Sequence, residues 1–221
     1  MLNNPGKKKE YNVPGEFIYP IEETINLTRP TNFPPINFWD VLDNRKSHRN
    51  FRKLSLEEIS KVLWSAAKVK EIQGQADGYM LTRRPSASAG ARHPIDILII
   101  SPALENNQNI YYYNPFDHSL NKLGIEKQVL TEFSHHANSI LSIYEGSLVW
   151  FLSHPDRTST KYVNPLSLIW RDAGALIHSF QVACSGLNIN SCAIGTLGEP
   201  FMSTMFSKFG KTFGAGGIII G

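Results

Sequence analysis

The sequence predicts an α+β domain, because strand-like and helix-like segments occur together without a regular order. Short runs of β-branched and aromatic residues are typical of strands, and other segments repeat apolar residues at helical spacing. These segments do not alternate as strand, helix, strand, which a doubly wound sheet would require. The 221 residues, 42% hydrophobic and 19% charged, fit one globular domain with an extension.

The first 35 residues are predicted to form an extended arm. They hold six of the 13 prolines, and each proline lacks a backbone donor and disfavours helix at the residue before it. Three lysines, residues 7–9, are followed by Glu10 and Tyr11 rather than by the apolar run of a signal peptide. We therefore divide the chain into an arm, residues 1–35, and a folded domain, residues 36–221, and expect a cytoplasmic protein.

Two helices are predicted at the start of the folded domain. The first has Phe38, Val41 and Leu42 on its inner face. The second begins at Ser55, which forms a capping box with Glu58 three residues later.

The rest of the domain is predicted to combine strands with two further helices. A polar helix covers about residues 125–137, and a core helix covers about residues 165–185, where apolar residues recur with a period near 3.6. Residues 74–92 are rich in glycine, serine and alanine and are predicted to be a loop with one short turn of helix. The predicted strands are residues 95–100, 110–113, 147–153, 188–194 and 217–220.

Several classes of function are disfavoured by the sequence. It contains neither the glycine-rich dinucleotide motif nor a P-loop. Of the seven histidines only His135 and His136 are close together, and adjacent helix positions do not face one site, so we expect no metal. A net charge of +3 is too small for a nucleic-acid-binding face. No apolar run approaches the ~20 residues of a membrane span.

Arg45, Ser47 and Arg49 stand in the pattern R-x-S-x-R. Two guanidiniums with a hydroxyl between them offer bidentate donors to a phosphate or to another planar acceptor. Taken alone, the same pattern also fits a solvated, charged link between two helices.

A second segment, residues 83–94, combines arginines with small residues just before a predicted strand. Small side chains allow a flat ligand to approach the backbone closely. Taken alone, the segment is equally a flexible loop.

Four motifs in order resemble the nitroreductase-like flavoproteins. They are R-x-S-x-R-x-F before the first long helix, R-P-S-x-S-x-G-x-R-H-P before a strand, W-R-D-A-G at residues 170–174 and A-I-G-T at residues 193–196. The chain is especially similar to the SagB-type branch, whose members are dehydrogenases that oxidise azoline rings in ribosomally made peptides. The resemblance covers residues 38–221.

The resemblance implies an FMN-dependent homodimer of nitroreductase-like fold, with a mixed central sheet flanked by helices and FMN at the dimer interface. A cation at the N1 and O2 edge of the flavin stabilises its anionic reduced form, and the protein otherwise supplies orientation. The residues assigned to FMN in this way are Arg45 and Ser47 for the phosphate, Arg49 for the N1 and O2 edge, Pro85, Ser86 and Ala87 for the ring of the other subunit, and Ile194, Gly195 and Thr196 near N5.

The sequence departs from the superfamily near its C-terminal end. The phosphate is usually also bound by a basic residue there, for which only Lys208 or Lys211 is available. The long C-terminal extension that wraps the partner in many nitroreductases does not follow residues 218–220, so we expect the arm to supply part of the dimer contact.

Lys161 and Tyr162 match, in residue type and position, the Lys-Tyr pair that is the catalytic signature of the azoline dehydrogenases. Azoline oxidation removes a proton from one ring carbon and a hydride from its neighbour, and a desolvated lysine is a suitable base because desolvation lowers its pKa. Tyr162 would orient the ring or relay the proton. The substrate would be a ribosomally made peptide. A cyclodehydratase, which would form the azoline rings, is the candidate partner.

Three alternatives remain open from the sequence. Lys161 and Tyr162 could be an ordinary surface lysine and a packing tyrosine. The chain could be an NAD(P)H-dependent nitroreductase or quinone reductase of the same fold. It could also be a non-catalytic scaffold of a biosynthetic complex.

Overall fold

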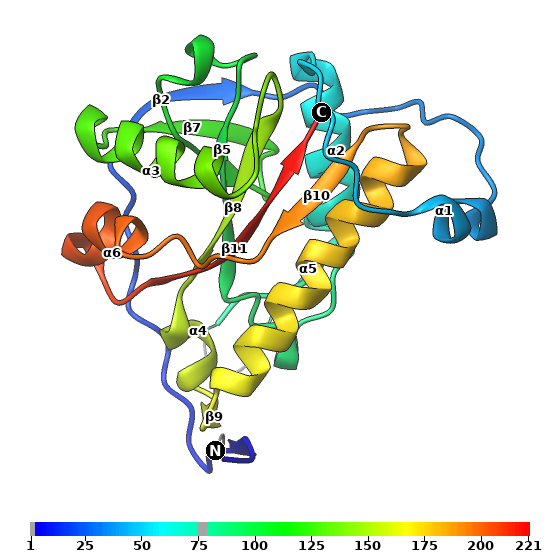
Figure 1. Cartoon of the computed structure of the whole chain (residues 1–221). Coiled ribbons are helices and arrows are strands. Elements are labelled where there is room, and N and C mark those ends of the chain that lie inside the picture. Colours follow the sequence, from blue (N-terminus) through cyan, green and yellow to red (C-terminus); the bar gives the residue numbers. More distant parts are fainter. Residues whose placement is uncertain (1–2, 75–78) are drawn as a thin grey trace.

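The computed structural model describes residues 3–74 and 79–221, which build a central sheet with helices on both faces (Figure 1). The sheet has seven strands. In sheet order they are β10 (Ser191–Ile194), β11 (Phe213–Ile220), β8 (Ser147–Ser153), β5 (Ile95–Ile100), β6 (Tyr111–Asn114), β7 (Ser119–Leu123) and β2 (Ile21–Asn26).

Every pair of neighbouring strands in this sheet is antiparallel. The α+β class is therefore confirmed, whereas the mixed sheet implied by the resemblance is not found among the described strands. One physical reason is that β6 and β7 are joined by only four residues, 115–118, and a connection this short can join only antiparallel strands.

Two hydrophobic cores lie on opposite faces of the sheet. Alternate side chains of a strand point to opposite faces, and in β5 the residues Ile97 and Ile99 join one core while Leu98 and Ile100 join the other. The first core is covered by α2 (Leu56–Ala67) and α5 (Leu166–Gly186), and the second by α3 (Lys127–Ile140) and α6 (Phe201–Phe206). All six side chains of β5 are buried because both of its faces are covered.

The predicted helices are found, with shifts of a few residues at their ends. The capping box of α2 is confirmed, since Ser55 accepts from the Glu58 N–H and Glu58 accepts from the Ser55 N–H. Two short helices were not predicted, α4 (Pro155–Ser159) and α6. The 3₁₀ turns are η1 (Ala89–Ala91), η2 (Glu105–Asn107) and η3 (Ser207–Phe209).

The first helix, α1 (Phe38–Asn44), does not pack as predicted. Val41 is buried, but Phe38, expected on the inner face, is 58% exposed. The reason is visible in Figure 1, where α1 stands at the edge of the molecule beside the C-terminal end of α5 rather than over the sheet. The hydroxyl of Ser185 donates to the carbonyl of Val41 there, at 3.0 Å.

The arm is extended but contains two strands that were not predicted. Strand β2 forms one edge of the central sheet, paired with β7, so the division at residue 35 does not coincide with the boundary of the sheet. Strand β1 (Gly6–Lys7) pairs with β9 (Tyr162–Val163) in a separate two-stranded sheet.

The predicted loop over residues 74–92 is partly regular. Strand β4 (Leu81–Arg83) pairs with β3 (Glu71–Gln73), which corrects the loop prediction for residues 81–83. The predicted short turn of helix corresponds to η1. Residues 75–78 of this segment lie outside the described residues.

Candidate active site

The small-residue loop that follows β4 is held closed by hydrogen bonds. The backbone N–H of His93 donates to the hydroxyl of Ser88 at 2.8 Å, and the His93 ring lies 2.9 Å from the carbonyl of Thr82. Gly90 has a φ of +61°, in the left-handed region where a side chain is disfavoured. The loop is therefore a built turn rather than a flexible connection.

Asp172 of α5 fixes the tip of this loop. Its carboxylate accepts from the Ser88 hydroxyl at 2.6 Å and from the Ala89 N–H at 3.0 Å. Burial raises the pKa of Asp172, and the bonds from Ser88 and Ala89 oppose that rise. Asp172 belongs to the W-R-D-A-G motif, but no role was predicted for it from the sequence. Its only signal was a carboxylate on a core helix.

Lys161 and Tyr162 meet the loop at Gly90. A Cβ built on Gly90 would lie 2.6 Å from the Tyr162 hydroxyl and 3.1 Å from the Lys161 Nζ. Both polar ends therefore converge on the residue beside Ala89, which Asp172 holds. Two predicted groups that are about 70 residues apart in sequence are thus side by side at the N-terminal end of α5.

The small-residue loop, Lys161 and Tyr162 together form the first group of candidate residues. Within this group Ser86 is buried, Ala87 is exposed and Pro85 is half-buried. A small cavity of about 20 Å³ lies beneath the loop and is lined by Ser86, Ala87, Ser88 and Asp172 among others. This cavity is too small to hold a flavin ring.

Residues 45–49 form a second group, beside the edge strand β10. The backbone N–H of His48 donates to the carbonyl of Ser191 at 3.0 Å. Lys46 and His48 line a cavity of about 410 Å³ against the C-terminal part of α5, and Arg45, Ser47 and Arg49 do not line it.

Neither guanidinium of this group is satisfied within the described part of the chain. Arg45 and Arg49 make no side-chain hydrogen bond or ion pair there, whereas Arg52, a few residues on, is paired with Glu58 at 2.6 Å. Arg49 and Ser47 are exposed and Arg45 is half-buried. This donor set fits a phosphate, which needs several charge-assisted hydrogen bonds.

Residues 194–196 continue β10 away from that phosphate-compatible group. Ile194 is buried, Gly195 is exposed, and a Cβ built on Gly195 would meet no atom within 4 Å. From Ser191 to Gly195 the chain advances by about 13 Å at 3.3 Å per residue. An extended molecule with a phosphate at one end and a flat ring at the other fits along this edge.

Lys208 and Lys211 do not join the second group within one chain. Both are exposed, and they precede β11, whose first residue Phe213 pairs with Ser153. Residues 45–49 contact the other end of the sheet, because Ser191 pairs with Ile220. The eight residues of β11 separate the two ends by about 25 Å.

The two groups also lie at opposite ends of α5. Lys161 and Tyr162 precede its first turn, and Val41, next to the second group, accepts a hydrogen bond from Ser185 in its last turn. A helix of 21 residues is about 30 Å long. The two groups of candidate residues are therefore far apart within one chain.

A buried charged network lies behind the first group and joins it to the arm. Arg157 of α4 donates two hydrogen bonds to the Asp96 carboxylate, at 2.6 and 2.9 Å, and one to the carbonyl of His93 at 3.3 Å. The Tyr19 hydroxyl donates to Asp96 at 2.9 Å and lies 3.0 Å from the His154 ring.

The pKa values in this network follow from burial and from Arg157. Burial alone would raise the pKa of Asp96, but Arg157 and His154 outweigh it and hold that pKa below its ordinary value. Burial lowers the pKa of His154. The Asp96 carboxylate is thus ionised, and Arg157 and Tyr19 donate hydrogen bonds to it.

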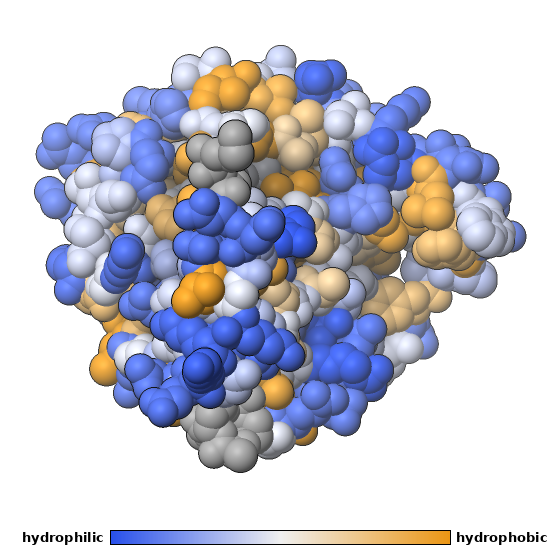
Figure 2. Space-filling model, turned by 90° about the horizontal axis from the view of Figure 1, so that it is seen from below, coloured by the Kyte–Doolittle hydropathy of each residue, from blue (hydrophilic) through white to orange (hydrophobic). Residues whose placement is uncertain are grey.

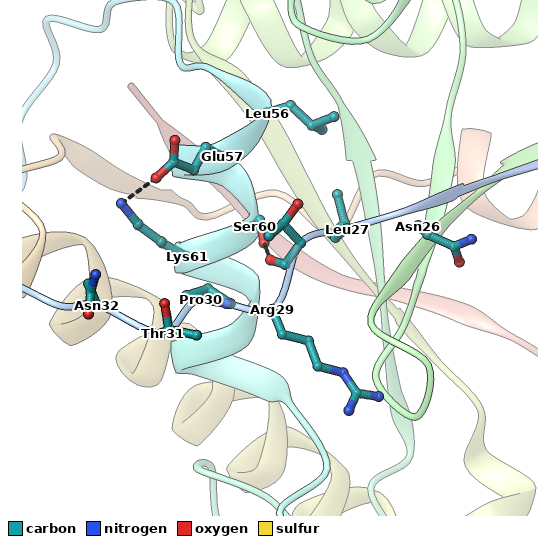
Figure 3. A pocket seen from close by; sticks show the side chains of 11 residues that line it. Asn26, Leu27, Arg29, Pro30, Thr31, Asn32, Leu56, Glu57, Ser60 and Lys61 are labelled. Atoms are coloured by element: carbon teal, nitrogen blue, oxygen red, sulfur yellow. Dashed lines mark hydrogen bonds and ion pairs between the residues drawn. The ribbon is translucent and has the colours of Figure 1, made fainter.

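Another cavity, of about 310 Å³, lies between the arm and α2, as Figure 3 shows. Its wall includes the ion pair between Glu57 and Lys61, at 2.7 Å. None of the predicted cofactor or catalytic residues lines it, so it is not the candidate site.

Comparison with known proteins decides the family. A model of the nitroreductase family matches residues 42–214, which is most of the chain. The chain belongs to the nitroreductase family. It is therefore an oxidoreductase of this family, and the matched region contains both groups of candidate residues.

Solved structures share this fold at low sequence identity. The chain is similar to a nitroreductase from Ralstonia eutropha, with a TM-score of 0.68, 18% identity, and coverage of 98% of this chain and 97% of that one. It is similar to a chain of the E. coli microcin synthetase McbBCD complex, solved with truncated pro-MccB17 bound, with a TM-score of 0.55, 17% identity and coverage of 88% and 76%. For a nitroreductase with bound FMN from Bacteroides fragilis the values are 0.51, 12%, 85% and 88%.

The sequence matches no curated protein. Within residues 3–74 and 79–221 there is no helix long and apolar enough to cross a membrane. Over the same ranges, no three histidine, cysteine, aspartate or glutamate side chains are grouped as a metal site would require.

Proposed function

We propose that this protein is an FMN-dependent dehydrogenase that oxidises thiazoline or oxazoline rings in a ribosomally made peptide. The observation that carries the proposal is the convergence of the Lys161 Nζ and the Tyr162 hydroxyl on Gly90, at the tip of the small-residue loop. This pairing places a base and a hydroxyl beside the loop that the resemblance assigns to the flavin. Similarity to a chain of a microcin synthetase supports a peptide substrate.

FMN would be held by the second group of residues. Arg45, Ser47 and Arg49 lie close together in sequence and make no side-chain hydrogen bond or ion pair among the described residues, which suits a phosphate and the N1 and O2 edge of the ring. Gly195 leaves open space for the ring. Lys208 or Lys211 stays a prediction for the phosphate, and it would have to come from the other subunit.

Two subunits would build each site. Since about 30 Å of helix separates the half-sites of one chain, we assign residues 45–49 and 194–196 to one subunit, and the loop with Lys161 and Tyr162 to the other. The exposed apolar residues of the arm and α1 are suited to the dimer contact. Those nearest to α1 are Phe33, Ile36, Phe38 and Trp39, the last 69% exposed.

The chemistry divides between the cofactor and these side chains. Bound FMN supplies the hydride acceptor. Lys161 takes the proton from the neighbouring ring carbon at its Nζ, so that the ring loses two hydrogen atoms and gains a double bond. Tyr162 orients the heterocycle through its hydroxyl, and Asp172 holds the loop against which both act. A cyclodehydratase partner would supply the azoline, and we propose a cytoplasmic location.

The test uses FMN-loaded protein and a synthetic thiazoline peptide, followed by mass spectrometry for the loss of two hydrogens. Lys161→Ala should abolish oxidation with FMN still bound, because it removes the base and leaves the cofactor residues intact. Lys127→Ala, which removes an exposed lysine of α3, is the matched control and should keep full activity.

Full activity of Lys161→Ala would reject Lys161 as the base. The competing function, an NAD(P)H-dependent nitroreductase or quinone reductase, predicts rapid NADPH consumption with a nitroaromatic or quinone acceptor by both variants. A colourless protein that takes up no FMN would instead support a scaffold.

A further inference from the structure

The N-terminal arm lies as a strand beside the Lys161 and Tyr162 pair. Gly6 pairs with Val163 and Lys7 with Tyr162, antiparallel. Lys8, the next residue, donates its backbone N–H to the Lys161 carbonyl at 2.9 Å. The side chain of Asn164 donates to the carbonyl of Asn4 at 3.2 Å.

This attachment is short. In the described residues β9 has no strand partner except β1, and residues 9–18 make no backbone hydrogen bond there. The next firm anchor is Tyr19, buried on Asp96 and His154. A segment held by so few hydrogen bonds opens at low cost, so β1 is replaceable while the rest of the arm stays in place.

The contacts made by β1 are mainly backbone hydrogen bonds, which another extended peptide could also make. A Cβ built on Gly6 would lie 3.3 Å from a methyl of Val163, which would have to shift by a few tenths of an ångström, so glycine fits that position best. Lys8 follows the paired residues and places a second cation opposite Lys161, which weakens cross-strand pairing. Tyr11 lies with its ring 5.7 Å from the Lys161 Nζ.

Figure 2 shows the face on which the N-terminal end and β9 lie, and its central part is mainly hydrophilic. An apolar groove is therefore not the feature that would hold a peptide here. Backbone hydrogen bonds to a strand edge are the remaining means of binding an extended chain, as in other cases of strand addition.

We propose that residues 161–163 are the docking strand for the peptide substrate, and that β1 occupies this edge until an extended peptide replaces it. The inference rests on the proposed function, since it places the substrate's backbone next to Lys161. It also specifies a sequence preference. A glycine of the substrate would pair with Val163, and the heterocycle two residues later would lie opposite Lys161. The ring nitrogen carries no hydrogen, so the pairing at Val163 and Tyr162 would hold the peptide without the bond that Lys8 donates to the Lys161 carbonyl.

The test compares two substitutions at one position in the full-length, FMN-loaded protein. Lys8→Pro removes the N–H that bonds to Lys161, whereas Lys8→Ala removes the charge and keeps the N–H. With a thiazoline peptide, Lys8→Pro should lower KM by about 2- to 10-fold, the range of one net backbone hydrogen bond. The kcat and the affinity for FMN should not change, and the KM of Lys8→Ala should not fall below that of the wild type.

An unchanged or raised KM in Lys8→Pro would overturn the proposal, because β1 would then not compete with the substrate. A second peptide with valine in place of the glycine two residues before the ring should bind more weakly to the wild-type protein. Equal KM values for the two peptides would also overturn it.

A binding measurement separates this inference from the proposed function. The affinity of a labelled thiazole peptide, the product, is measured by fluorescence anisotropy and does not depend on turnover. Tighter binding to Lys8→Pro without any azoline oxidation would reject the dehydrogenase function but keep the docking strand. Oxidation by the wild type with equal peptide affinity for all variants would reject the docking strand alone.

Discussion

Gly90 gives the sharpest test of the arrangement around Lys161 and Tyr162. In Gly90→Ala the new Cβ would lie 2.6 Å from the Tyr162 hydroxyl and 3.1 Å from the Lys161 Nζ. The residue would also keep a φ of +61°, which costs a non-glycine residue about 1–2 kcal/mol. Both contacts are with the outer ends of side chains rather than with backbone, so these ends would have to move aside at an overpacking cost of about 1 kcal/mol. The free energy of unfolding should fall by about 2–3 kcal/mol in total.

A double-mutant cycle isolates the contact from the backbone cost. Tyr162→Phe removes the oxygen that the new methyl would meet at 2.6 Å. Gly90→Ala combined with Tyr162→Phe should therefore be more stable than the sum of the single variants, by about 1 kcal/mol. Urea denaturation followed by circular dichroism measures all four proteins.

Gly15→Ala is the control, because a Cβ at Gly15 meets no atom within 4 Å. It should leave the urea midpoint unchanged. If the Gly90 and Tyr162 variants were additive within about 0.3–0.5 kcal/mol, the two residues would not be in contact and the first half-site would be wrongly built.

Two further predictions concern the supports of the site. Asp172→Ala removes the acceptor for the Ser88 hydroxyl and the Ala89 N–H, so urea denaturation should show a loss of about 1–3 kcal/mol. Asp172→Asn keeps one acceptor oxygen and should lose less, and equal losses would show that the bonds do not hold the loop. Burial lowers the pKa of both His93 and His118 to about 4, so the unfolded state binds more protons than the folded state below pH 6.5. Stability should therefore decrease as the pH falls from 6.5 to 4, by about 2 kcal/mol per histidine at pH 5, and a flat profile would refute this. Replacing the exposed His135 by glutamine should leave that profile unchanged.

The elements that the sequence predicted are those with strong local signals. Helix α2 has its capping box, and α5 has an apolar stripe over 21 residues. Strands β5 and β8 are buried along their whole length, and their sequences are mainly apolar, apart from Asp96 in β5 and the serines at the two ends of β8. Each signal lies within the element itself, which is why no knowledge of the partners was needed.

The elements that were missed depend on their partners. Five of the six residues of β2 are exposed, so it has no alternation of apolar and polar residues, and only its pairing with β7 makes it a strand. Strands β1 and β9 are two residues each. Phe38 was predicted to be buried because it is apolar and lies in a helix. Nothing in the sequence indicates that this helix stands at the edge of the molecule, where Phe38 is exposed.

The residues of the candidate site were predicted by motif, but their grouping was not. The sequence places Arg45 before Lys161 without showing that α5 holds them at opposite ends. It also gives no sign that Asp172 bonds to Ser88, since the two are 84 residues apart. These relations follow from tertiary packing, whereas the assignment of Pro85, Ser86 and Ala87 to the flavin of the other subunit is already implied by the resemblance.

The central claim is that each site joins half-sites from two chains, and a heterodimer tests it most directly. One chain carries Arg45→Ala with Arg49→Ala, the other carries Lys161→Ala, and two different affinity tags allow the mixed dimer to be purified after coexpression. Each variant homodimer should fail to oxidise a thiazoline peptide. The mixed dimer has one intact site and should reach about half the wild-type rate per dimer. A mixed dimer as inactive as both homodimers, beside an active wild type, would contradict the account.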